Sequence, residues 1–158
     1  MTYDKLKILN KHETNEILGK LQEQFGVKEI PGILVMRGAE RIFLFNGDYS
    51  GEEITRLEGT IPIERVGVYF AKIFAPTGEI RLSIEGTQIL KDQFKKNVFE
   101  LDNEQAEQWM KGNELLVESK MVGFVIMKHG ENYMGCGKAS EKKISNFIPK
   151  NRRLKEKS

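Results

Sequence analysis

The sequence has few of the residues on which thiol and metal chemistry depend: one cysteine and two histidines among 158 residues. A single cysteine, Cys136, cannot form an internal disulfide, which favours a reducing cytoplasm as the compartment. His12 and His129 are isolated, and neither has the spacing to Cys136 that a metal-ligand motif requires. We therefore expect no metal site.

Long hydrophobic runs are also missing. The longest apolar stretches, such as residues 42–45 and 123–127, are far shorter than the roughly 20 residues that span a bilayer. The opening MTYDKLKILNKHE has no hydrophobic core region followed by small residues, so no secretory signal is expected. These features predict a cytoplasmic protein with no membrane partner.

Charge is nearly balanced over the whole chain but not along it. The formal net charge is +2, whereas the segment from Lys138 onward holds eight basic residues and two acidic ones. A basic segment on an otherwise neutral protein favours a polyanion partner, and nucleic acid is the leading candidate. The alternative is a solvated terminus that only keeps the protein in solution.

The first half of the chain shows alternating helix and strand patterns. Asn10 and Glu13 have the spacing of a capping box, and the apolar stripe after them stops at Gly26, which predicts a helix. Apolar and alternating runs predict strands at residues 32–36, 42–45, 65–74 and 80–84. A second capping-box spacing, Ser50 to Glu53, predicts a short helix that continues to residue 57.

The second half predicts a strand at 98–101, one helix and then several short strands. Asp102 is placed to cap the helix, whose Trp109 shares an apolar face with its neighbours, so a core role is expected for the indole. Gly112 ends the helix. Strands are then predicted at residues 115–118, 122–128, 133–138 and 144–148. This order favours a small β-barrel with one helix packed over an opening.

The polar stretch KDQFKKN, residues 91–97, interrupts the apolar pattern. We place a module boundary there, which divides the chain into an α/β module at 1–93, a second domain at 97–153 and a basic tail at 154–158. The expected fold class is α+β.

The stretch YMGCGKAS contains the end of a phosphate-loop pattern but fails its remaining requirements. A phosphate loop needs GxxxxGK followed by Ser or Thr, whose hydroxyl binds magnesium. Asn132 stands at the first glycine position and Ala139 follows the lysine. Gly135 and Gly137 instead predict a bend or close packing in a strand.

Cys136 does not satisfy the sequence requirements of a catalytic nucleophile. A nucleophilic cysteine needs a base and an orienting group, and no local pattern connects either histidine to this thiol. We expect Cys136 to pack as a small apolar side chain. No carboxylates form a local pair with apolar shielding that would indicate acid-base catalysis.

The run FELDNEQAEQWMKGNELLVESKMVGFVIMKHGENYMGCGKASEKKISNFIPKNRR resembles a PUA domain, the RNA-binding module named for pseudouridine synthases and archaeosine transglycosylases. The resemblance rests on the helix leading to WMKGNEL, the pair GFVIMKHG and YMGCGKAS, and the closing ISNFIPKNRR. It is similar to archaeal ribosome-biogenesis factors and to the C-terminal region of Sun-type RNA cytosine-C5 methyltransferases. The first half is similar to the α/β (pre-PUA) module that precedes PUA in such proteins.

Two departures limit what the resemblance implies. The Pro-Gly turn of many PUA domains is replaced by Glu, Ser and Lys at residues 118–120. A methyltransferase of this type needs a cofactor-binding domain and a Pro-Cys nucleophile motif, whereas Gly135 precedes Cys136 and no glycine-rich loop follows a strand in a βαβ unit. The resemblance therefore extends to the non-catalytic appendage, and no cofactor is expected.

The resemblance implies that RNA lies against the turn between the helix and the following strand. This turn corresponds to Lys111, Gly112 and Asn113, with Lys138 nearby. Basic residues nearer the C-terminus would add phosphate contacts that position the RNA rather than specify its sequence. They are Lys142, Lys143, Lys150, Arg152 and Arg153.

We therefore expect a non-catalytic protein that binds structured RNA, either rRNA or tRNA, in ribosome biogenesis or RNA modification. A methyltransferase or ribosome-assembly proteins are candidate partners. The alternative is a protein-interaction subunit that docks through its first module onto a separate RNA-modifying enzyme.

Overall fold

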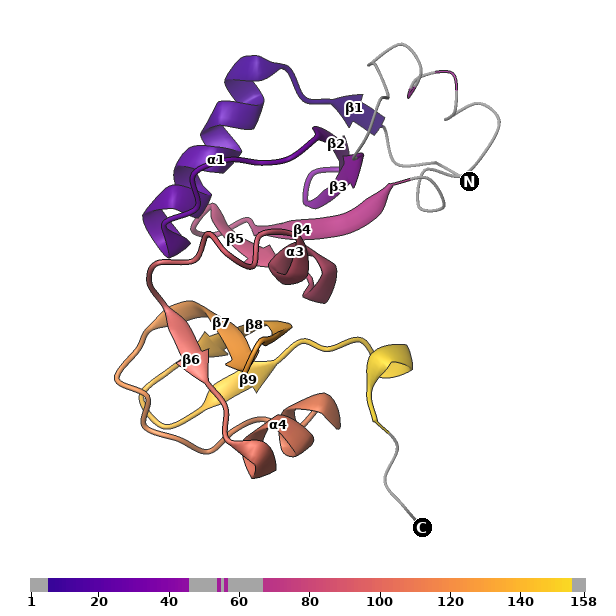
Figure 1. The fold of residues 1–158 in the computed structure, drawn as a ribbon. Helices are drawn as coiled ribbons and strands as arrows, with labels where there is room; N and C mark the ends of the chain where they lie inside the picture. Colours follow the sequence, from indigo (N-terminus) through magenta and orange to yellow (C-terminus); the bar gives the residue numbers. More distant parts are fainter. Residues whose placement is uncertain (1–5, 46–53, 55, 57–66, 155–158) are drawn as a thin grey trace.

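The structure is a computed structural model that describes residues 6–45, 54, 56 and 67–154. The short helix expected over residues 50–57 lies outside the described residues except at Ile54 and Arg56. All of the basic tail after Leu154 lies outside them as well. The described chain forms two β-sheets with α-helices packed on them, so the α+β class is confirmed (Figure 1).

The first sheet is an antiparallel meander in which each strand pairs with the next along the chain. Its strands are β1 (Leu6–Ile8), β2 (Ile33–Arg37), β3 (Arg41–Phe45), β4 (Val68–Phe74) and β5 (Glu79–Leu82). The predicted hairpin of β2 and β3 is confirmed.

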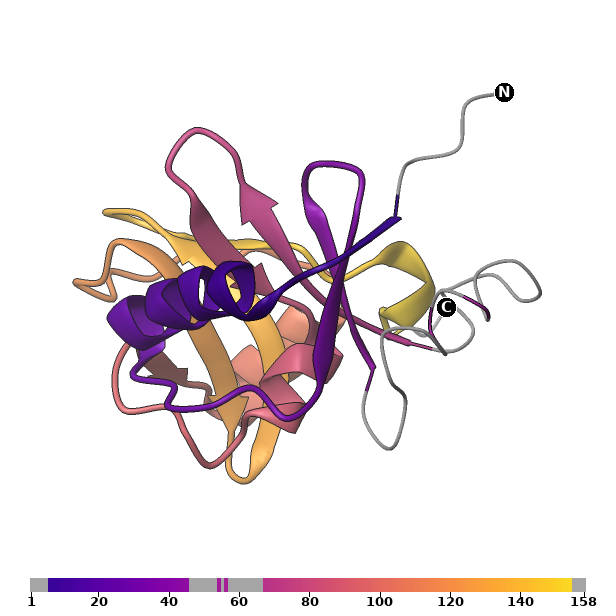
Figure 2. The same cartoon turned by 90° about the horizontal axis from the view of Figure 1, so that it is seen from above.

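Helix α1 (Lys11–Phe25) is confirmed together with both of its end signals. Asn10 and Glu13 form the capping box, and the helix ends at Gly26, whose φ of 77° is left-handed and so favours glycine. A hydrogen bond from Lys7, followed by one from the Asn10 backbone, lowers the pKa of Glu13. Figure 2 shows α1 from above, running across the strands beneath it.

Helix α3 (Ile84–Ile89) was not predicted from the sequence, because the alternating pattern suggested a strand through residue 84. The strand β5 stops at Leu82, so the last two residues of that prediction are wrong. Ser83 caps the helix: its Oγ accepts from Gly86 N at 2.9 Å and donates to Phe70 O at 3.0 Å. Ser83 therefore follows the last residue of β5 and caps the first turn of α3.

The second sheet has the order β6-β7-β8-β9, with a parallel first pair and antiparallel pairs after it. Its strands are β6 (Val98–Glu100), β7 (Gly123–His129), β8 (Asn132–Ala139) and β9 (Ile144–Asn146). The strand expected at residues 115–118 is reduced to a single bridge between Leu115 and Ile144. Leu116 beside it is 87% exposed, while Leu115 is buried and Val117 is partly buried against the same cluster, so the segment keeps one half-buried face without a full ladder of strand pairing.

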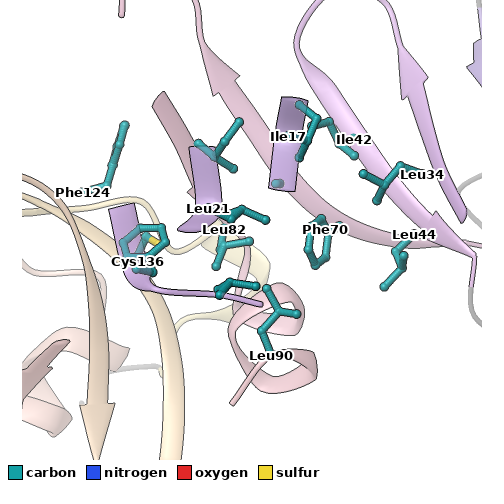
Figure 3. Close-up of a cluster of buried hydrophobic side chains, with 14 of the residues drawn as sticks. Ile17, Leu21, Leu34, Ile42, Leu44, Phe70, Leu82, Leu90, Phe124 and Cys136 are labelled. Carbon is teal, nitrogen blue, oxygen red and sulfur yellow. The ribbon is translucent and has the colours of Figure 1, made fainter. Parts of the chain in front are cut away.

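The two sheets share buried contacts. One hydrophobic cluster joins side chains of α1 and the first sheet to Phe124, Ile126 and Cys136 of the second sheet (Figure 3). The buried Thr87 hydroxyl of α3 also accepts a hydrogen bond from Gly135 N of β8 at 3.1 Å. Residues 91–97 separate the strands of the two sheets, while the independence of the two expected domains stays a prediction.

No helix in the described parts of the chain combines the length and the apolar character that crossing a membrane would require.

Candidate nucleic-acid interface

Helix α4 (Asn103–Met110) positions the turn that was expected to meet RNA. Asp102 and Gln105 form its capping box, and Ala106 and Trp109 are buried against the second sheet. The Trp109 indole Nε1 donates to Met134 O at 2.9 Å. The predicted core role of Trp109 is therefore confirmed, and this hydrogen bond connects the C-terminal end of the helix to β8.

In the turn after this helix, residues 111–113, the backbone adopts at one position a left-handed conformation that favours glycine. Gly112 has a φ of 90°, and its N–H donates to Trp109 O at 2.9 Å. Asn113 is exposed, and its Nδ2 donates to Gln108 Oε1 at 2.6 Å. We call these three residues the α4 turn. Of the three, Asn113 is the exposed residue, whereas Lys111 and Gly112 are half-buried.

Asn146, at the end of β9, connects the α4 turn to the chain beyond the sheet. Its Nδ2 donates to Trp109 O at 2.8 Å and to Asn113 O at 3.0 Å. Its Oδ1 accepts from Ile148 N at 2.8 Å. These three partners fix the amide orientation. Sequence reasoning missed this residue, because its role depends on contacts across 33 or more positions.

The chain after β9, residues 147–154, folds back onto the α4 turn, and we call it the C-terminal segment. Leu154 N donates to Met110 O at 2.7 Å, and Arg153 Nε donates to Ile148 O at 2.9 Å. A Cβ at Gly112 would stand 2.4 Å from Arg153 Cδ. The guanidinium side chain therefore lies directly over the glycine, and the structure brings these two predicted site residues together.

Arg152 lies in η2 (Lys150–Arg152) but points away from the α4 turn toward the first half of the chain. Its guanidinium forms an ion pair with Glu85 of α3. This contact ties the C-terminal segment to the junction between the sheets. Part of the charge of Arg152 is therefore already balanced.

The predicted lysines differ in how far their charges are neutralised. Lys111 is 3.5 Å from Glu107, and Lys143 is 3.0 Å from Glu114. Lys142 and Lys150 are exposed, and neither forms an ion pair with any residue that the structure describes. These two ammonium groups are the ones most available to a phosphate.

The structure does not bring Lys138 to the α4 turn. Its Nζ lies 4.1 Å from the ring centroid of Phe74 and 5.7 Å from that of Phe124. Gly137, its neighbour in β8, faces Trp109 beneath α4. Successive side chains of a strand point to opposite faces, so Lys138 lies on the face turned toward the first sheet.

The glycines and the cysteine of β8 have packing roles. A Cβ at Gly137 would stand 2.4 Å from Ile144 Cγ2 and 2.8 Å from Trp109 Cη2, so the predicted close packing is confirmed. Cys136 is buried, and burial raises the pKa of its thiol to about 12. A thiol with that pKa is protonated at neutral pH and is a poor nucleophile. Among the described residues, no group of three His, Cys, Asp or Glu side chains could hold a metal ion.

Residues 96–154 match the family profile described as the methyltransferase RsmF PUA domain. The matched region contains the second sheet, α4 and η2, and so includes the whole α4 turn and the described C-terminal segment. This part of the chain is similar to the PUA domain at the C-terminal end of Sun-type methyltransferases, as the sequence motifs predicted. No curated protein matches the chain. The PUA match points to RNA as a ligand.

Proposed function

We propose that this protein is a non-catalytic RNA-binding protein that holds structured RNA, either rRNA or tRNA, in ribosome biogenesis or RNA modification. One observation carries the proposal: the PUA-like region clamps a basic C-terminal segment onto the α4 turn, with Arg153 lying over Gly112. The arrangement places positive charge beside an exposed polar turn on a rigid support.

Each part of this surface has a separate task in the proposed complex. Lys142 and Lys150, exposed and outside any ion pair with described residues, neutralise phosphates and so position the RNA. Asn113 offers its amide to the edge of an unpaired base, which can supply preference for one sequence. Arg153 holds the segment in place, because its Nε is engaged by Ile148 O.

The proposed absence of catalysis has support from the chemistry of β8. Its thiol is buried in an apolar cluster and held in the protonated form by the raised pKa. Gly135 and Gly137 of the same strand lie close to neighbouring side chains, Gly135 to Ile84 and Gly137 to Ile144 and Trp109. The proposed site of action is the cytoplasm, where a free thiol stays reduced.

A docking role is the second candidate, in which the protein presents a surface to a methyltransferase or to ribosome-assembly proteins. The observation that favours it is the loop before β7, where Leu116 is 87% exposed and Val122 is 86% exposed. Exposed apolar side chains of this kind often mark contact sites when they form a patch. This loop lies in the second half, whereas the sequence suggested the first module as the docking surface.

Ultraviolet crosslinking of the purified protein to structured RNA, followed by mass spectrometry of the crosslinked peptides, tests the proposed function. Crosslinks are expected in the peptides that contain the α4 turn and residues 142–153. Crosslinks confined to the first sheet, or none at all, would contradict the proposal. The same crosslinking in cells, with sequencing of the bound RNA, identifies the target.

A further inference from the structure

A pocket lies where the two halves of the chain meet. Its walls come from β4, β5 and the start of α3 on one side, and from β8 and the C-terminal segment on the other, with a volume of about 80 Å³. At roughly 10–15 Å³ for each water molecule, this volume holds several waters. We call it the junction pocket.

The junction pocket combines an aromatic ring with a cation. The Arg81 guanidinium lies 4.4 Å from the centroid of the Phe147 ring, and the tilted Phe124 ring has its centroid 6.2 Å from the Phe147 centroid. Phe147 is 37% exposed, an unusual state for a large aromatic side chain. Arg81 forms no ion pair with any described residue, so its charge is available to an anion.

The remaining walls define what kind of anion fits. Leu82, Ile84, Met134 and Ile148 supply apolar surface, which a bare inorganic ion would not use. Glu85 also lines the pocket, but Arg152 pairs with it and balances its charge. A planar ring carrying a phosphate matches these walls better than an isolated phosphate does, because rings stack on aromatic faces while phosphates pair with guanidinium groups.

The pocket is continuous with the proposed RNA surface. Ile148, Pro149 and Arg152 line the pocket and belong to the C-terminal segment. The carbonyl of Ile148 binds Arg153, which lies over the α4 turn. An RNA strand that follows the C-terminal segment therefore reaches the pocket without leaving the protein surface.

We propose that the junction pocket binds one unpaired pyrimidine nucleotide of the RNA, with its base against Phe147 and its phosphate on Arg81. The inference rests on the proposed RNA-binding function and adds a base-specific subsite formed by both halves of the chain. The pocket is small, at about 80 Å³, so the single six-membered ring of a pyrimidine suits it better than the fused rings of a purine.

The test uses the full chain and two probes, a fluorescein-labelled short oligouridylate and a labelled hairpin RNA without unpaired pyrimidines. Phe147→Leu removes the aromatic ring, and Arg81→Gln removes the charge. Arg41→Gln is the matched control, because its guanidinium also lies near a phenyl ring, 5.9 Å from the Phe43 centroid, but in β3 and outside the pocket. Circular dichroism establishes that each variant is folded.

Each pocket variant should weaken oligouridylate binding by about 5-fold to about 100-fold, the range found when one base loses its stacking partner. Arg41→Gln should stay within about twofold of the wild type, and the hairpin RNA should bind all variants alike. The wild type should also bind oligouridylate more tightly than oligoadenylate.

Two results would overturn the subsite. In the first, Phe147→Leu and Arg81→Gln bind oligouridylate as tightly as the wild type does, or lose no more affinity than the Arg41→Gln control. In the second, the wild type binds the hairpin RNA but not oligouridylate. This result would contradict the proposed subsite and leave the proposed RNA-binding function intact. If the wild type binds neither RNA, the proposed function itself fails. Should Phe147→Leu not fold, Arg81→Gln decides the matter alone, since its side chain is on the surface of a strand.

Discussion

Replacing Asn146 by aspartate exchanges the side-chain amide NH2 for an oxygen and removes two donated hydrogen bonds. In the wild type the amide Nδ2 donates to Trp109 O and Asn113 O, at 2.8 Å and 3.0 Å. In Asn146→Asp a carboxylate oxygen takes its place and faces both carbonyl oxygens. The bond that Oδ1 accepts from Ile148 N survives. The variant therefore keeps the shape of the side chain and loses only the two donated bonds.

The expected cost follows from these two bonds. Each contributes about 1 kcal/mol to stability, and the repulsion between a carboxylate and two carbonyl oxygens adds to the loss. We expect the free energy of unfolding to fall by about 2–4 kcal/mol at pH 7. At about 2–4 °C for each kcal/mol in a chain of this size, the melting temperature falls by about 4–16 °C.

The cost should depend on pH with a defined sign. The surrounding carbonyls raise the pKa of the introduced carboxyl above its unfolded value of about 3.9, so its destabilising effect is present at neutral pH. Below that unfolded value the carboxyl is neutral in both states and can donate one hydrogen bond. The difference in stability between variant and wild type should therefore shrink as the pH falls from neutral toward about 4, and should stay at its minimum below that pH.

Thermal melts followed by circular dichroism measure the effect, with Asn151→Asp as the matched control. Asn151 is exposed in η2 and undergoes the same change in charge. Its melting temperature should stay within about 2 °C of the wild type. Equal melting temperatures for the two variants would refute the assignment of Asn146 as the connection between the α4 turn and the C-terminal segment.

Three further outcomes are expected. Gly112→Ala should lower the free energy of unfolding by about 1–3 kcal/mol in a chemical denaturation series, because alanine is strained in left-handed backbone and its Cβ displaces Arg153. An unchanged free energy of unfolding would mean that the contact between Gly112 and Arg153 is not maintained. Cys136→Ser should leave the affinity for RNA unchanged in filter binding. In the wild type, burial raises the pKa of the Cys136 thiol to about 12, so the thiol should react with iodoacetamide at neutral pH only when the protein unfolds. Rapid alkylation of the folded protein would contradict the burial of this thiol. A fragment starting at Asn97 should fold and give dispersed amide resonances, but its melting temperature should be lower than that of the full chain, because the fragment exposes Phe124 to water. An unfolded fragment would show that the two halves depend on one common core.

Local signals account for the parts of the fold that the sequence predicted well. The helices that begin at Lys11 and Asn103 each have a capping box written into four consecutive residues, and glycine follows the end of each helix. These interactions form within one turn, so they need no knowledge of the tertiary structure. The hairpin of β2 and β3 was predictable for the same reason.

The errors come from residues whose conformation depends on distant partners. Ser83 continues an alternating pattern, and only its bond to Phe70 O, across the sheet, shows that it caps a helix. Leu116 has the apolar character of a strand residue, yet the pairing of its segment with β9 is limited in the described residues to the single bridge between Leu115 and Ile144. In both cases the tertiary environment overrides the local preference.

The candidate site was predictable in part. The motifs placed the α4 turn and the basic residues on the same domain, and the fold brings Arg153 onto Gly112. The sequence could not separate cations with ion-pair partners, such as Arg152, from exposed ones, such as Lys150. It also could not reveal the junction pocket, because its walls come from both halves of the chain.

Filter binding of a structured RNA across a salt series tests the central claim most directly, with Lys142→Ala/Lys150→Ala compared with Lys28→Ala/Lys91→Ala. All four lysines are exposed, and both double variants lose the same charge. If Lys142 and Lys150 contact phosphates, their loss should lower the slope of log affinity against log salt by about 1.4 to about 1.8, whereas the control should keep the wild-type slope. Identical slopes for the two double variants would contradict the account and leave Lys142 and Lys150 with a solubilising role only.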